Sequence, residues 1–172
     1  MSVRVLVAYA TKHGATEEIA QKIGEVLGQA SLNPEVLPAQ SVGELAPYAG
    51  VVLGSAVYVG AWRKEAVAFL KDNESALAQL PLWIFSSGPT GEGEAVELAN
   101  GWLLPDALRD TVDRIGPRDV VLFHGKVDVE ELGLVERLML KMVKAPAGDF
   151  RDWDAIAAWA KGVADTLKGD AE

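Results

Sequence analysis

A short segment rich in hydroxyl and cationic side chains carries the clearest chemistry in this sequence. It lies between an apolar run at residues 3–10 and a helical pattern that begins at Glu17, and its residues are Thr11, Lys12, His13, Gly14, Ala15 and Thr16. The start of a helix offers unpaired N–H groups and the positive end of the helix dipole, so an anion is stabilised there. Threonine hydroxyls donate to phosphate oxygens, and glycine permits close backbone approach. The segment predicts an anion site, although Thr16 alone is also a candidate helix N-cap.

Two common nucleotide fingerprints do not occur in this segment. It contains neither the Gly-x-Gly-x-x-Gly pattern of dinucleotide-binding proteins nor the Gly-Lys-Ser/Thr ending of a P-loop. A Rossmann dehydrogenase and a nucleoside triphosphatase are therefore disfavoured.

A second segment joins small residues to aromatic rings after the apolar run at residues 50–56. Its candidate binding residues are Ser55, Ala56, Val57, Tyr58, Val59, Gly60 and Trp62. Small residues let the backbone approach a planar ligand, and the rings of Tyr58 and Trp62 could stack on it. For Trp62 the alternative is packing at the start of the following helix.

A third segment is rich in glycine, serine and proline and follows the apolar run at residues 80–86. Its candidate binding residues are Ser86, Ser87, Gly88, Pro89 and Thr90, whose amides are suited to the edge of a planar ring. No aromatic residue follows before Trp102. An uncovered ring face would leave room for a substrate and so favours an enzyme over an electron carrier.

Strand and helix patterns alternate along the chain. Apolar runs predict strands at residues 3–10, 35–38, 50–56, 80–86 and 119–124. Amphipathic patterns predict helices at residues 17–30, 62–72, within 94–114, at 133–144 and at 152–167. Such alternation predicts a single α/β domain over residues 1–172, with helices on both faces of a parallel sheet.

Composition limits the chemistry further. The chain has no cysteine and two histidines, which excludes disulfides and thiolate chemistry and disfavours a metal site. Any redox reaction must then use an organic cofactor. The net charge of −9 argues against nucleic-acid binding, and solubility alone also explains it. No apolar run reaches the roughly 20 residues of a membrane span, and no export signal is visible, so we expect a cytoplasmic protein.

The first segment resembles the Thr-x-Thr-Gly-x-Thr phosphate loop of flavodoxins, with His13 in place of the middle threonine. This resemblance implies a flavodoxin-like fold, a three-layer sandwich whose five strands have the order 2-1-3-4-5. It also implies that the loop wraps the phosphate of flavin mononucleotide (FMN), with the His13 imidazole replacing one hydroxyl. In this fold the ligand lies at the carboxyl ends of the strands, where the three segments meet.

The last third of the chain is similar to the flavodoxin-domain family that includes the bacterial menaquinone-dependent protoporphyrinogen oxidase. The similarity rests on residues 123–128, the helix pattern at 134–144 and residues 149–154, which end in Asp-Trp-Asp. It implies an FMN-dependent oxidoreductase of heme biosynthesis that oxidises a porphyrin substrate and passes electrons to a quinone. The alternatives are an electron-transfer flavodoxin that docks to a redox partner protein, and an interaction module that has lost its flavin. No catalytic residue and no oligomeric state can be assigned.

Two features of this region each have two possible interpretations. Arg137, Lys141 and Lys144 share one face of the helix at 134–144, which either contacts the inner face of a membrane or covers the sheet. His124 ends a strand on the cofactor side and is either a general base or a histidine held by local backbone.

Overall fold

Five parallel strands form the centre of the structure, a computed structural model that describes residues 2–172. From one edge to the other they are β2 (Asn33–Pro38), β1 (Arg4–Ala10), β3 (Gly50–Tyr58), β5 (Leu82–Ser87) and β6 (Asp119–Phe123). When these five parallel strands alone are numbered along the chain, their order is 2-1-3-4-5, which confirms the prediction. The carboxyl ends of β1, β3 and β5 therefore lie side by side at one end of the sheet.

The strand sequences explain their places in the sheet. Residues 5–10 of β1 are buried, as expected for a central strand covered on both faces. Strand β2 lies at the edge, where Pro34 and Pro38 are tolerated because one side of the strand needs no partner.

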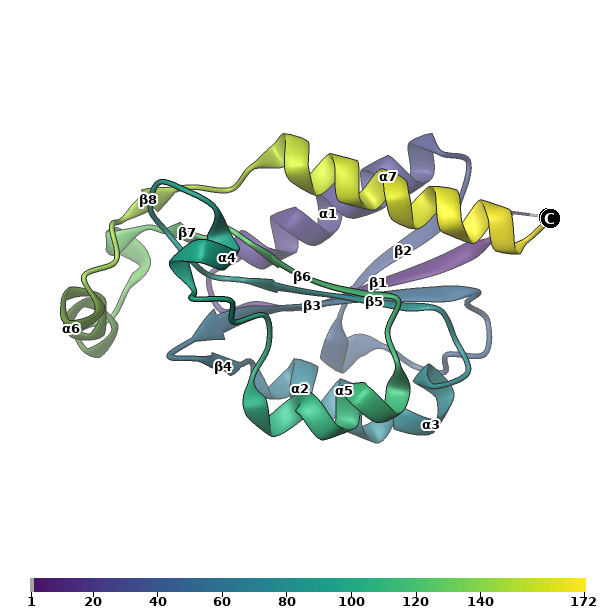
Figure 1. Cartoon of the computed structure of the whole chain (residues 1–172), viewed down its shortest axis with the longest axis horizontal. Coiled ribbons are helices and arrows are strands. Elements are labelled where there is room, and N and C mark those ends of the chain that lie inside the picture. Colours follow the sequence, from purple (N-terminus) through teal and green to yellow (C-terminus); the bar gives the residue numbers. More distant parts are fainter. Residues whose placement is uncertain (1) are drawn as a thin grey trace.

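In residues 2–172, seven α-helices surround or extend this sheet. They are α1 (Ala15–Gln29), α2 (Lys64–Asp72), α3 (Glu74–Leu77), α4 (Ala95–Leu98), α5 (Arg109–Ile115), α6 (Leu134–Val143) and α7 (Trp153–Asp170). Helices α1 and α7 cover one face, and α2, α3 and α5 cover the other, which makes the three layers that were predicted (Figure 1). Helix α6 covers neither face and projects beyond the carboxyl ends of the strands (Figure 1).

Two apolar clusters hold the layers together, because successive residues of a strand face opposite sides. Val5 and Val7 of β1 pack with Ile19 and Ile23 of α1 on one face. The alternate residues of β1 pack with Ala66, Phe69 and Leu70 of α2 on the other.

Apart from shifts of a few residues at element ends and the short helix α3, which was not predicted, the structure differs from the sequence prediction in three main places. The helix predicted from residue 62 begins at Lys64, because Trp62 pairs with Val57 in the short antiparallel strand β4 (Ala61–Trp62). The helix predicted within 94–114 is two helices, α4 and α5, separated by a bend at Gly101 (φ 80°) and by Pro105. A small antiparallel sheet of β7 (Lys126–Val127) and β8 (Gly148–Asp149), which was not predicted, frames α6.

Three 3-10 helices complete the described chain, namely η1 (Ala39–Ser41), η2 (Asp106–Leu108) and η3 (Val129–Glu131). Over residues 2–172, no helix combines the length and apolar character that crossing a membrane requires.

Candidate functional site

The loop between β1 and α1 has the geometry of an anion site. Gly14 precedes the first helical residue and adopts a left-handed conformation (φ 89°) that glycine reaches without strain. Its N–H donates to the Thr11 hydroxyl at 3.0 Å, which closes the turn. The next amides, of Ala15 and Thr16, belong to the first helical turn and so have no acceptor within the helix. Since Gly14 is the N-cap, Thr16 does not have the capping role that was its alternative.

The segment after β3 forms a hairpin with β4 and presents the ring of Tyr58. The ring is half-buried, and three cationic or ionisable side chains surround it. Lys12 Nζ lies 5.6 Å and Arg63 Cζ 5.9 Å from the ring centroid, while the His13 ring meets it edge-on at 6.2 Å. Burial raises the pKa of Tyr58, so the ring is a neutral phenol that brings no charge to the site.

The side chains of Trp62, Ser55 and Ser86 have partners inside the protein. Trp62 is 6% exposed and packs in the cluster on the α2 face, and its Nε1 donates to Ser86 Oγ at 2.8 Å. Ser86 donates in turn to the Leu103 carbonyl, and Ser55 Oγ accepts from the Arg63 N–H at 3.0 Å. The ring of Trp62 therefore packs in the core just before α2, as the alternative prediction had it. It does not line the hollows described below.

The loop after β5 is held by His124. Its Nδ1 lies 3.2 Å from the Pro89 carbonyl oxygen, and its Nε2 lies 2.7 Å from that of Gly93. Ser87 Oγ adds a bond to the carbonyl of His124 at 3.4 Å. A neutral imidazole donates to only one of these carbonyls, whereas the imidazolium donates to both. The contacts of His124 thus match the second of its alternatives, a histidine held by local backbone.

The Thr90 hydroxyl differs from these satisfied groups. It is buried, and no residue in the described part of the chain gives it a hydrogen-bond partner. Buried polar atoms are almost always paired, so this hydroxyl at a cavity wall is available to pair with a polar group of a ligand or with water. Thr90 lines the larger of two hollows at this end of the sheet.

These two hollows adjoin one another. The smaller, of about 70 Å³, is lined by all three predicted segments, including Thr11, His13, Thr16, Tyr58 and Ser87. The larger, of about 650 Å³, is mostly apolar and continues past Tyr58 and Gly88 toward α6. Its volume lies within the range of small-molecule sites. Together they offer a polar end beside the anion loop and an apolar end beside the aromatic ring.

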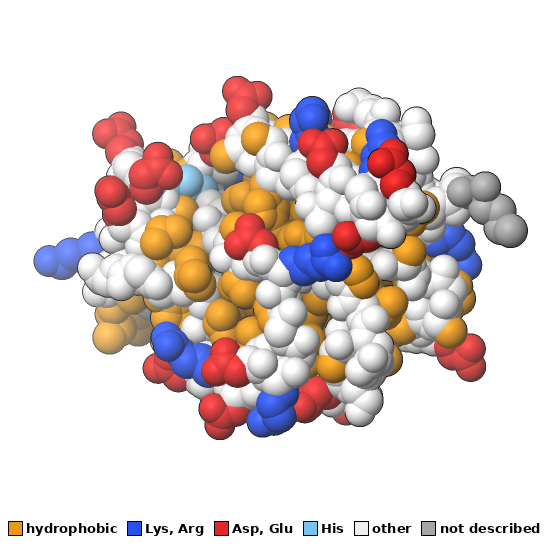
Figure 2. All heavy atoms as spheres, turned by 45° about the vertical axis from the view of Figure 1, so that its right-hand side comes forward, with side chains coloured by type: hydrophobic (Ala, Val, Ile, Leu, Met, Phe, Trp, Pro, Cys, Tyr) orange, Lys and Arg blue, Asp and Glu red, His pale blue; other side chains and the backbone are white. Residues whose placement is uncertain are grey.

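Helix α6 provides one wall of the larger hollow through Met139, Leu140 and Val143. None of its side chains is buried, and Leu134 and Met142 are 86% and 74% exposed. The space-filling view shows hydrophobic side chains gathered toward the end of the molecule that carries α6 (Figure 2). The predicted alternative that this helix covers the sheet is wrong, because the helix lies beyond the strands' ends.

Glu136 of α6 is a residue that the sequence analysis did not identify. One carboxylate oxygen accepts from Lys12 Nζ at 2.8 Å, and the other lies 2.9 Å from His13 Nε2. These two hydrogen bonds lower the pKa of Glu136 to about 2. The sequence shows only an acidic residue in the first turn of a helix, so only the fold brings it to the anion loop.

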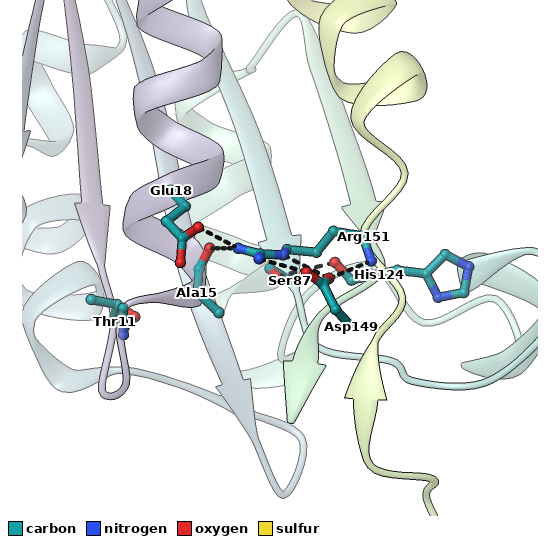
Figure 3. A network of polar contacts seen from close by, with 8 residues as sticks. Thr11, Ala15, Glu18, Ser87, His124, Asp149 and Arg151 are labelled. Atoms are coloured by element: carbon teal, nitrogen blue, oxygen red, sulfur yellow. Dashed lines mark hydrogen bonds and ion pairs between the residues drawn. The ribbon is translucent and has the colours of Figure 1, made fainter. Parts of the chain in front are cut away.

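A second missed residue, Arg151, connects the other side of the anion loop to β8. Its guanidinium, 3% exposed, binds Asp149 through two bonds of 2.9 and 2.8 Å and donates to the Ala15 carbonyl at 3.1 Å. Glu18 lies 3.5 Å away and adds a weaker ion pair. Figure 3 shows this guanidinium between Asp149 and the first turn of α1. Hydrogen bonds to Asp149 raise the pKa of Arg151, and the same contacts lower that of Asp149.

Comparisons with known proteins agree with this geometry. The family model described as a flavodoxin domain matches residues 6–154. Proteins of this family bind FMN and transfer electrons to redox partner proteins. A search of curated proteins finds no match.

Solved structures share the fold at low sequence identity. A flavodoxin from the domain Archaea has a TM-score of 0.66 at 14% identity and covers 96% of this chain and 99% of its own. Flavodoxin 2 from Bacillus cereus has a TM-score of 0.58 at 19% identity, covering 98% and 99%. The flavodiiron core of Flv1 from Synechocystis sp. PCC6803 has a TM-score of 0.65 at 18% identity, and this chain spans 37% of that longer chain.

These comparisons contain no support for a closer relationship with protoporphyrinogen oxidase or for a role in heme biosynthesis. They favour the electron-transfer alternative over that prediction. The fold, the anion loop and the family match lead to one conclusion: this chain belongs to the flavodoxin domain family.

Proposed function

We propose that this protein binds FMN in the two adjoining hollows and transfers electrons to a redox partner protein. The observation that carries this proposal is the meeting of three segments, the anion loop, Tyr58 and the Ser87–Thr90 loop, around one polar and one apolar hollow. FMN has a matching division between a phosphate tail and a planar ring. The bound flavin would supply the electron chemistry, and the protein would supply binding, orientation and electrostatics.

The anion loop would hold the phosphate. The amides and hydroxyls of residues 11–16 are the donors, and the helix dipole of α1 favours the negative charge. Tyr58 would stack on the ring, and the orphan hydroxyl of Thr90 would pair with a polar atom of the ring edge. The amides of residues 55–57 and 86–89 remain candidates through their backbone, whatever their side chains contact.

The surface charge suits a protein partner. The net charge of −9 would steer a basic partner toward the molecule and keep acidic ones away. The same charge would disfavour the anionic reduced flavin and lower its redox potential below that of free FMN. A redox titration that gave a higher potential would contradict this electrostatic argument.

A second candidate function rests on the exposed apolar face of α6. A protoporphyrinogen dehydrogenase that delivers electrons to a membrane quinone would need contact with the bilayer. Leu134 and Met142 are exposed on α6, Lys141 is an exposed cation of this helix, and Lys144 is an exposed cation at its C-cap. An apolar face with flanking cations is suited to an anionic lipid surface.

Absorbance of the purified protein tests FMN binding. We expect a flavin spectrum, or its recovery on adding FMN, and release of FMN on denaturation. A colourless protein that cannot be reconstituted would reject the proposal and favour an interaction module without flavin. If the protein binds FMN, an assay of protoporphyrinogen turnover with a quinone acceptor would distinguish the second candidate function from an electron carrier.

Flotation with liposomes of anionic and neutral lipid tests the membrane contact. We would compare the wild type with the Lys141→Glu/Lys144→Glu variant and with Lys161→Glu/Lys168→Glu on α7 as a control of equal charge change. Arg137 is left intact because it donates to the carbonyls of Val129 and Leu132. Loss of anionic-lipid binding in the α6 variant alone would support contact, and equal binding by all three proteins would reject it.

A further inference from the structure

The carboxylate of Glu136 occupies the cationic side of the anion loop. Its two oxygens divide between Lys12 Nζ at 2.8 Å and His13 Nε2 at 2.9 Å. Lys12 and His13 are the two side chains of that loop able to carry positive charge. Across residues 2–172, neither forms an ion pair with any other carboxylate. The side chains of Lys12 and His13 are therefore already in contact with an anion that the protein itself supplies.

Among the polar side chains of α6 in the described chain, Glu136 is the one that bonds to the body of the protein. Helix α6 has no buried side chain. Its other polar side-chain contact in the described chain, from Arg137, goes to the carbonyls of Val129 and Leu132 in the segment just before the helix. The two bonds of Glu136 reach more than 120 residues back in sequence, to the start of α1. Where α6 lies thus depends on a contact at the anion loop.

A phosphate bound at this loop would meet the carboxylate. The phosphate group of FMN carries close to two negative charges at neutral pH and would be stabilised by these two side chains besides the amides and hydroxyls of the loop. Two anions that share one pair of donors repel each other, so each weakens the binding of the other. Lys12 keeps two further N–H groups and His13 keeps its second ring nitrogen, so Glu136 competes through its negative charge and through the two donors that it occupies.

We propose that Glu136 is a resident competitor for the phosphate, so that FMN binding releases α6 from the anion loop. This inference rests on the proposed FMN function and concerns the regulation of the same site. Release would move the wall formed by Met139, Leu140 and Val143, and so open the apolar hollow beside the ring position. Binding of FMN would thus itself open the way for a partner protein to reach the flavin ring.

Thermodynamic linkage gives the proposal a second, reciprocal consequence. If FMN favours the released helix, then anything that shifts the helix toward release must also raise FMN affinity. Replacing Glu136 with glutamine is the simplest such change, because it keeps the shape of the side chain and removes the charge. The affinity for FMN is therefore expected to rise when this carboxylate is removed.

Binding titrations with FMN and with riboflavin test the competition, because riboflavin has the same ring and no phosphate. For Glu136→Gln we expect FMN to bind roughly threefold or more tightly, the scale of partly exposed ion pairs, with riboflavin unchanged. Glu131→Gln is the matched control, since Glu131 is a nearby exposed carboxylate without a side-chain partner in the described chain. It should leave both affinities unchanged. Circular dichroism checks that each variant is folded.

Hydrogen exchange of the wild type tests the release of α6. Amides of residues 134–143 should exchange several-fold faster with FMN than without it, and riboflavin should not produce this effect. In Glu136→Gln they should exchange rapidly with or without FMN. Inorganic phosphate at high concentration is a second probe and should act in the same direction as FMN.

Each outcome has a clear meaning. Equal or weaker FMN binding by Glu136→Gln would overturn the competition, as would an equal gain for riboflavin. Slower exchange of α6 on FMN binding would overturn the release. A wild type that binds neither FMN nor riboflavin would instead refute the proposed function, and the response of α6 to inorganic phosphate would still decide whether Glu136 competes at the loop.

Discussion

The indole Nε1 of Trp62 donates a hydrogen bond to Ser86 Oγ across 2.8 Å inside the core. The bond joins β4 to β5 beneath the site, and Ser86 in turn donates to the Leu103 carbonyl. Trp62 thus supports the segments after β3 and β5 from below without lining either hollow.

We expect Trp62→Phe to lower the free energy of unfolding by about 1 kcal/mol, because it removes one buried hydrogen bond and keeps most of the ring. FMN affinity should not change. Urea denaturation and flavin titration measure the two effects. If FMN affinity fell while stability held, the stacking prediction for Trp62 would be restored.

Tyr58 should behave in the opposite way. Its half-buried ring lies where the two hollows adjoin, so Tyr58→Ala should weaken the binding of FMN and riboflavin by about tenfold each. Tyr58→Phe preserves the ring and should bind both ligands like the wild type. A loss confined to FMN would show that Tyr58 acts through the phosphate end, by way of Lys12 or His13.

Arg151→Met should destabilise the protein by about 2 kcal/mol, since it leaves the Ala15 carbonyl and Asp149 without their buried charged donor. Arg118→Met is a suitable control. The ion pair of Arg118 with Asp170 is exposed on both sides, and its loss should cost well under about 1 kcal/mol. Thermal or urea unfolding of both variants makes the comparison. Equal losses would mean that the Arg151 network does not hold β8 to α1.

The three tyrosines should make stability fall at alkaline pH. Burial and the hydrogen bond to Glu17 raise the pKa of Tyr9 to about 12, and burial also raises those of Tyr48 and Tyr58. Above about pH 10 the unfolded chain loses tyrosine protons that the folded chain keeps, so the folded state binds more protons. The contribution of the tyrosines to stability is then constant below that pH and decreases as pH rises toward 12. Tyrosinate absorbance that appeared at pH 10 in the folded protein would contradict this.

The order of strands and helices was predictable because it depends on local patterns. The run at residues 3–10 is apolar at every position but one, which predicts a buried parallel strand, and residues 5–10 of β1 are buried accordingly. Ile19, Ile23 and Leu27 repeat at helical spacing and pack against the sheet as that spacing requires. The anion loop was predictable for the same reason, since a strand, a glycine turn and a helix start lie within a few residues of one another.

The roles of Trp62, Glu136 and Arg151 were not predictable, because each depends on a partner far away in the chain. An aromatic residue at a strand end suits a ligand or the core equally well, and only the pairing of β3 with β4 turned Trp62 toward Ser86. Glu136 looked like an ordinary first-turn acid of an amphipathic helix until the fold placed it against Lys12 and His13.

The sequence by itself determined the α/β order and the anion loop, since periodicity and turn chemistry act over a few neighbouring residues, and the resemblance to flavodoxins implied the order of the strands in the sheet. Only the tertiary structure decided which side chains face the hollows, that α6 lies beyond the sheet, and that a carboxylate from this helix meets the anion loop. The reason is physical: local patterns specify which face of an element is apolar, whereas contacts between distant elements depend on how the whole chain packs.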